Sequence, residues 1–135
     1  MRTYLDWNAT TPLRPEVKAA ITEALEISGN PSSVHTEGRA AKMALERARE
    51  QVAVALGADG ADVVFTAGAT EAAAMVLGQG GFHCAPVEHS AVKVWCEADL
   101  AVDGDGIVTV TDPARTSLQL ANNETGVMQD LPQGL

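Results

Sequence analysis

The residues around Thr70 have the types and spacing that bind an anion. An apolar run at 63–65 is followed by Gly68 and then by a helix-forming alanine run at 72–74. A strand that turns into a helix in this way presents free backbone N–H groups and the positive end of the helix dipole. We therefore predict that the N–H groups of Ala69 and Thr70, with the Thr70 hydroxyl, bind a phosphate. The alternative is a helix whose Thr70 hydroxyl caps its own backbone.

Two further polar groups follow expected strands, at positions where parallel sheets bind ligands. His89 comes after a strand expected at 83–85, and Asn122 and Asn123 follow one expected at 117–121. An imidazole there can stack on a flat ring or transfer protons near neutral pH. Adjacent amides can donate to an oxygen-rich ligand. Two alternatives stay open: a histidine beside a helix cap, and an Asx turn that closes the strand.

Patterns for metal or nucleotide binding are weak. Asp103-x-Asp105-Gly106 resembles the start of a calcium loop, but Ile107 and Ala114 stand where later ligands belong. We predict a turn there. The turn before Thr70 follows neither GxxxxGK[ST] nor GxGxxG, which argues against a nucleotide loop.

Hydrophobic periodicity predicts the elements that position these residues. Helices are expected at about 15–27, 39–56, 70–77 and 90–98, and strands at about 63–65, 83–85, 107–110 and 117–121. Short buried strands that alternate with helices indicate a mostly parallel sheet covered by helices. We therefore predict an α/β fold in which residues 1–60 form an N-terminal helical arm and residues 61–135 form the sheet and its helices.

Composition and charge exclude several partners. The 135 residues carry a formal charge of −9, so the chain has no long-range attraction for nucleic acid or for an anionic membrane. Its apolar runs fall well short of the ~20 residues of a membrane span. Cys84 and Cys96 have neither disulfide-framework nor metal-ligand spacing; we expect Cys84 inside a strand and Cys96 in a helix. Because no basic and apolar leader opens the chain, we expect a cytoplasmic protein.

Five motifs occur in an order that is specific when they are taken together. They are Tyr4-Leu5-Asp6-x-Asn8-Ala9-Thr10-Thr11, Gly29-Asn30-Pro31-Ser32-Ser33-x-His35, Phe65-Thr66-x-Gly68-Ala69-Thr70-Glu71, Glu88-His89 and Asn122-Asn123-Glu124-Thr125-Gly126-Val127. In this order they resemble the opening part of cysteine desulfurases, the pyridoxal-phosphate enzymes of the class V aminotransferase group. The similarity runs across nearly the whole chain.

This resemblance implies a fold and a role for each site residue. The fold is the N-terminal part of a fold-type I large domain that binds pyridoxal 5'-phosphate, preceded by the helical arm. Residues matching Ala69 and Thr70 bind the cofactor phosphate. The residue matching His89 stacks on the pyridine ring and takes part in proton transfers. The residue matching Asn123 lies by the ring hydroxyl and the substrate carboxylate.

The resemblance also implies a reaction and partners. Sulfur is removed from L-cysteine, leaving L-alanine and a persulfide on an enzyme cysteine. The sulfur then passes to an acceptor or scaffold protein, as in iron–sulfur cluster assembly. Family members are usually homodimers, so a homodimer is expected.

Several family residues have no match in this sequence. The Schiff-base lysine, the aspartate facing the pyridine nitrogen, the persulfide-forming cysteine and the substrate-binding arginine all come later in the family. Lys18, Lys42 and Lys93 match no lysine motif, and Cys84 and Cys96 match no nucleophile motif. The segment between the expected helix at 90–98 and the strand at 117–121 is also shorter than usual in the family.

Three hypotheses therefore remain open. The chain is the N-terminal part of a desulfurase and is inactive alone. It is instead a non-catalytic remnant or interaction module with a partial cofactor pocket. Or it belongs to another class V activity, such as a selenocysteine lyase or a transaminase.

Overall fold

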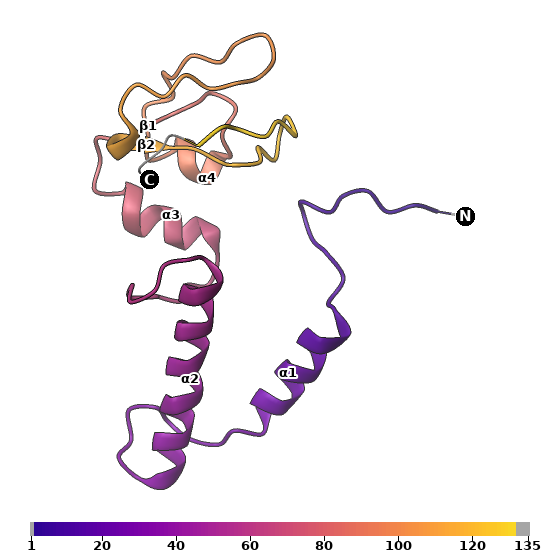
Figure 1. The fold of residues 1–135 in the computed structure, drawn as a ribbon, viewed down its shortest axis with the longest axis vertical. Coiled ribbons are helices and arrows are strands. Elements are labelled where there is room, and N and C mark those ends of the chain that lie inside the picture. The colour runs from indigo at the N-terminus through magenta and orange to yellow at the C-terminus, as the bar shows by residue number, and fades with distance from the viewer. Residues whose placement is uncertain (1, 132–135) are drawn as a thin grey trace. The chain divides into compact units, whose positions relative to one another are not determined.

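The computed structural model describes residues 2–131 and contains two compact units (Figure 1). The first unit ends at Phe65 and the second begins at Thr66. The domain boundary that we predict after residue 60 stays a prediction. Within the described residues, no helix is both long enough and apolar enough to cross a membrane.

The first unit contains two helices, α1 (Pro15–Leu25) and α2 (Thr36–Ala55). Pro15 opens α1, where its missing N–H costs no hydrogen bond. His35 caps α2 by accepting a 3.4 Å hydrogen bond from the Gly38 N–H group, so this helix begins three residues earlier than predicted. Gly38 is buried, and an added Cβ would collide with the Ser33 carbonyl. The loop and the first turn of α2 therefore pack closely.

The prediction of a strand at 63–65 is wrong. These residues form no strand, and the side chains of Val64 and Phe65 are exposed. A strand requires a hydrogen-bonded neighbour, and no described segment pairs with this one. The Arg49 guanidinium of α2 lies instead over the Phe65 ring, with its central carbon 6.0 Å from the ring centroid.

The second unit contains α3 (Ala69–Leu77), β1 (His83–Cys84), α4 (Ser90–Lys93), the 3₁₀ turn η1 (Pro113–Arg115) and β2 (Thr116–Ser117). The strands β1 and β2 pair in parallel, with His83 opposite Thr116 and Cys84 opposite Ser117 (Figure 1). On its other side, His83 forms a parallel bridge with Glu97. The predicted α/β class with a parallel sheet is confirmed.

Three predicted elements are shorter in the structure, and in each case long-range pairing sets the limit. Helix α4 stops at Lys93 rather than near residue 98, since Glu97 has to bridge His83. In place of a strand at 107–110, only Val108 pairs, in an antiparallel bridge to Val102. The strand expected at 117–121 is reduced to β2, with a separate bridge further on between Ala121 and Met128.

The core of the second unit lies directly beside β1. Ala85, Leu100 and Val108 are buried together, and Val87, Val102 and Leu118 pack against them. The predicted turn near Asp103 joins two sides of this core: the Asp103 Oδ1 atom accepts hydrogen bonds from the N–H groups of Asp105 and Ile107, both at 2.9 Å. The predicted turn is therefore confirmed.

Candidate functional site

The N-terminus of α3 has no side-chain cap. Gly68 takes the N-cap position in extended backbone, and Ala69 and Thr70 are the first two helical residues. The first N–H groups of a helix have no preceding turn to bind. A Cβ added to Gly68 would meet nothing within 4 Å, so the space beside the N-cap is open. This helix start can accept an oxygen-rich anion at the positive end of the dipole.

Thr66 and Glu71 hold the turn that leads into α3. The Thr66 hydroxyl donates a 3.0 Å hydrogen bond to the Gly68 carbonyl. The Glu71 carboxylate accepts a 2.6 Å hydrogen bond from the Ala67 N–H group, which resembles one half of a capping box. Because Glu71 binds an N–H group ahead of the helix, the first N–H groups of α3 remain for an anion. The alternative in which Thr70 caps its own helix does not occur.

His89 is the N-cap of α4. Its Nδ1 atom accepts a 3.1 Å hydrogen bond from the Ala91 N–H group, so the helix-cap alternative is present. An Nδ1 atom that accepts leaves the ring proton on Nε2. The residue is exposed, so this cap leaves a ring face and the Nε2 edge accessible within the described unit. Capping fixes the tautomer and orients the imidazole.

The two adjacent asparagines do different work. Asn122 is 4% exposed, and its Oδ1 atom accepts from the N–H groups of Glu124 and Thr125, both at 2.9 Å. Its Nδ2 atom donates a 3.0 Å hydrogen bond to the Val87 carbonyl. Asn122 thus forms the Asx turn that the sequence left open. Asn123 is half-buried, and its Nδ2 atom donates to the Glu124 carboxylate at 3.1 Å.

Gln119 connects the histidine loop to the asparagine turn, a role that the sequence did not reveal. Its backbone N–H group donates a 3.0 Å hydrogen bond to the Glu88 carboxylate. Its side-chain oxygen accepts from the Asn123 N–H group at 3.3 Å. The available signal was a glutamine inside an expected strand, four residues before Asn123.

Glu88 is a buried carboxyl group directly before His89. It is 1% exposed, and its second oxygen, Oε2, has no hydrogen-bond partner among the described residues. Burial raises the pKa of Glu88, although the N–H groups of Gln119 and His89 oppose this. The carboxyl group therefore joins two loops at an electrostatic cost.

The second unit brings the predicted site residues onto connected elements. Glu88, Gln119 and Asn122 hydrogen-bond the loop before His89 to the turn that contains Asn123. Helix α3, whose first two residues are Ala69 and Thr70, packs against α4. The roles of Ala69, Thr70, His89 and Asn123 toward a ligand stay predictions. The motifs near Tyr4 and Asn30 belong to the first unit.

The two thiols lie beside one another in the second unit. Cys84 is fully buried in β1, as predicted, whereas Cys96 lies beyond the end of α4 rather than in the expected helix. Burial raises the pKa of the Cys84 thiol to about 11, and the adjacent Cys96 adds to this shift. Burial also raises the pKa of Cys96, although its hydrogen bond with Cys84 opposes the shift. Neither environment activates a thiolate at neutral pH.

Comparisons with a family model and with individual proteins agree on one family. The model of the family described as "Aminotransferase class-V" matches residues 3–98. The chain is 34% identical to a selenocysteine lyase of Bos taurus over 178 residues, covering 98% of this chain and 41% of that protein. It is 37% identical to cysteine desulfurase IscS of Dictyoglomus turgidum over 157 residues, covering 96% of this chain and 40% of that protein.

Solved structures agree with these sequence relatives. The chain resembles a NifS-like protein from Rickettsia africae with a TM-score of 0.80 and 31% identity, covering 93% of this chain and 41% of that one. A second NifS-like protein has a TM-score of 0.75 and 32% identity. The chain therefore spans about two fifths of the length of these relatives.

Proposed function

Because the chain belongs to the class V aminotransferase family, whose members depend on pyridoxal phosphate, we propose that it forms part of the cofactor site of a cysteine desulfurase. The proposed reaction removes sulfur from L-cysteine and leaves L-alanine. The open helix start at α3 carries this proposal, because it offers an anion a set of donors for which no partner is seen among residues 2–131.

The residues at α3 fit the phosphate of the cofactor. A phosphate ester carries three acceptor oxygens, and the N–H groups of Ala69 and Thr70 with the Thr70 hydroxyl supply three donors. Oriented backbone amides act on an anion at short range. The net charge of −9 therefore does not prevent a phosphate from binding there. In this proposal the helix start holds the phosphate end of the cofactor.

His89 and Asn123 are proposed to act at the ring end. The helix cap on Nδ1 orients the imidazole and keeps its proton on Nε2, from which the ring can donate a hydrogen bond to the cofactor or to a substrate group. The Asn123 side chain offers an amide for the ring hydroxyl and the substrate carboxylate. When bound, pyridoxal phosphate supplies an electron sink for bond cleavage in an amino-acid substrate.

Selenocysteine lyase is a second candidate that the relatives specifically favour. The Bos taurus and Homo sapiens relatives with this name each cover 98% of the chain, at 34% and 33% identity. Sulfur and selenium differ little in size, so the residues described here give no steric reason to choose between the two substrates. L-cysteine remains the first proposal because several desulfurases also match nearly the whole chain.

We propose the remaining family properties on the same basis. These are transfer of sulfur to an acceptor or scaffold protein, a homodimeric assembly and a cytoplasmic location. The open hypothesis of a non-catalytic module with a partial cofactor pocket makes the opposite prediction on turnover.

Substrate turnover tests the proposal and separates the candidates. The natural protein that contains these residues is supplied with pyridoxal phosphate and a thiol reductant, and alanine is measured from L-cysteine and from L-selenocysteine. Alanine from both, with sulfide from L-cysteine, supports a desulfurase. Alanine from L-selenocysteine alone supports the lyase. No alanine from either substrate would overturn both and support the non-catalytic module.

A further inference from the structure

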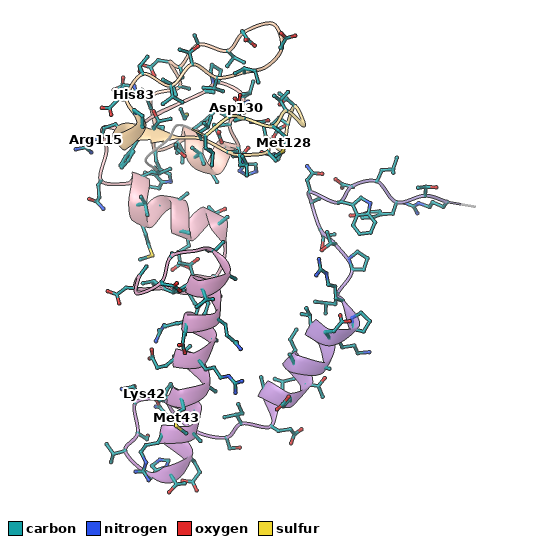
Figure 2. All side chains as sticks on the ribbon, in the orientation of Figure 1. Lys42, Met43, His83, Arg115, Met128 and Asp130 are labelled. Carbon is teal, nitrogen blue, oxygen red and sulfur yellow. The ribbon has the colours of Figure 1, made fainter. Side chains whose placement is uncertain are left out.

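A histidine and two carboxylates lie together beside strand β1. None of the three is a residue that we propose to bind the cofactor. One ligand atom each from His83, Glu97 and Asp99 lies within 4.8 Å of the other two. His83 is half-buried, and the two acidic residues are exposed (His83 is labelled in Figure 2). The His83 Nδ1 atom also lies 2.9 Å from Asp99 Oδ1.

The sheet register accounts for this grouping. His83 and Glu97 are partners in a parallel bridge, so their side chains leave neighbouring strands at one level. Asp99 is two residues beyond Glu97, and side chains at i and i+2 point to the same face of an extended strand. Two hydrogen bonds to the segment around His83 hold the Glu97 backbone: its N–H group donates to the Phe82 carbonyl and its carbonyl accepts from the Cys84 N–H group, both at 2.9 Å. The backbone therefore places the three side chains near one another.

The charge of the group is not balanced by a lysine or arginine ion pair among the described residues. The imidazole of His83 donates a hydrogen bond to the Asp99 carboxylate, which raises the pKa of His83, and the charges of Asp99, Glu97 and Asp112 add to this shift. Three carboxylates, those of Asp99, Glu97 and Asp112, therefore act on one imidazole. A cation of charge +2 would neutralise the two carboxylates that lie within ligand distance.

We propose that His83, Glu97 and Asp99 bind a first-row divalent cation of the Zn²⁺ class. One imidazole nitrogen and two carboxylate oxygens suit Zn²⁺ and Co²⁺, with remaining positions open to water or a further ligand. Ligand atoms around tetrahedral Zn²⁺ lie about 3.4 Å apart, given bonds of about 2.1 Å. The site therefore requires the exposed carboxylates to move closer together by a change of rotamer when the ion binds. This site does not depend on the proposed cofactor or reaction.

The chain offers a matched control. His35 Nδ1 lies 2.9 Å from the Glu37 carboxylate. These two residues form a second histidine–carboxylate pair. Among the described residues it belongs to no group of three such ligands. His35→Asn keeps a side chain that can cap α2, and His83→Asn keeps an amide beside Asp99. His83→Asn therefore removes one ligand of the proposed site, whereas His35→Asn removes a histidine that belongs to no such group.

Zn²⁺ binding to the full chain, measured by isothermal titration calorimetry, tests the site. We expect one Zn²⁺ for each chain, with the affinity unchanged in His35→Asn and reduced about tenfold or more in His83→Asn and Glu97→Gln. Circular dichroism checks that each variant is folded. No binding to the unmodified chain at millimolar Zn²⁺ would overturn the site, as would unchanged affinity in the folded His83→Asn variant.

A second measurement needs no variant. Substoichiometric Co²⁺ is added to the unmodified chain, and paramagnetic broadening of its NMR signals is mapped. We expect the broadening to centre on His83, Glu97 and Asp99 and to spare His35 and His89. A centre at either of those histidines would overturn the site. So would the ultraviolet charge-transfer band of a thiolate–cobalt bond, which would assign the ion to Cys84 and Cys96 instead.

Discussion

The Glu88 carboxylate accepts a 3.0 Å hydrogen bond from the backbone N–H group of Gln119, 31 residues further along the chain. Glu88 is almost fully buried and immediately precedes His89, while Gln119 binds the backbone of Asn123 through its side chain. One buried carboxyl group thus sets the spacing between the two residues that we propose to act at the ring end of the cofactor.

Glu88 gives the fold a pH dependence of known sign. Burial raises its pKa, so the folded state favours the protonated carboxyl group. The stability that this contributes is fully present below the ordinary glutamate pKa and is lost as pH rises through the raised value. The unfolding free energy of Glu88→Gln minus that of wild type should therefore be larger at about pH 7 than at about pH 4. Urea unfolding at both pH values measures this, and an equal difference at both would contradict it.

Removing the Glu88 side chain should have a different result. Glu88→Ala leaves the Gln119 N–H group without its acceptor and should cost about 1–3 kcal/mol of unfolding free energy. Glu88→Gln keeps an acceptor oxygen and is the matched control. The two variants unfolding at the same urea concentration would show that the hydrogen bond contributes nothing.

The adjacent asparagines should separate structure from binding. Asn122→Ala removes a buried side chain that bonds to Val87 and closes a turn, so it should cost about 1–3 kcal/mol. Asn123→Ala should cost less than Asn122→Ala, because Asn123 is only half-buried and its amide contact to Glu124 is exposed. Asn123→Ala should nevertheless weaken pyridoxal phosphate binding. Denaturant titration and equilibrium dialysis give the two readings, and the reverse order of stabilities would contradict the assignment.

The two cysteines should differ in reactivity. Cys84 is fully buried with a thiol pKa of about 11, whereas Cys96 is partly exposed. Iodoacetamide under native conditions should therefore alkylate Cys96 first, and Cys84 should react only after unfolding. Peptide mapping by mass spectrometry after timed quenching measures the order. Rapid native alkylation of Cys84 would contradict the buried assignment.

No lysine of the chain should form a covalent link to the cofactor. The Lys93 ammonium group donates a 3.2 Å hydrogen bond to the Pro86 carbonyl, and Lys18 and Lys42 lie on the exposed sides of α1 and α2. After incubation with pyridoxal phosphate and borohydride reduction, we expect no stoichiometric pyridoxyl-lysine in a peptide map. Stoichiometric modification of any one of the three would show that the chain carries its own linking lysine.

Local signals were sufficient to predict much of the fold. Pro15 and the apolar spacing behind it predict α1, and Gly68 and Gly78 bracket α3. The turn at Asp103 follows from side-chain acceptors that bind the backbone two and four residues on. These elements depend on residues close in sequence, so the sequence alone determines them.

Elements that depend on distant partners could not be predicted in the same way. The end of α4 depends on the bridge from Glu97 to His83, and residues 63–65 have the pattern of a strand but no described neighbour. The role of Gln119 depends on Glu88, far away in sequence. Periodicity reports which residues are apolar but not which strand or loop they meet.

Discrimination between pyridoxal phosphate and pyridoxal by the Thr70→Ala variant tests the central claim most directly. Thr22→Ala is the control, because the Thr22 hydroxyl donates to the Lys18 carbonyl within α1. By equilibrium dialysis, wild type and Thr22→Ala should bind the phosphorylated form more tightly. Thr70→Ala should lose about tenfold or more of that affinity, since a hydrogen bond to a charged group contributes about 1.5–3 kcal/mol, and should bind pyridoxal as before. Equal affinity of wild type and Thr70→Ala for pyridoxal phosphate would contradict a phosphate site at α3.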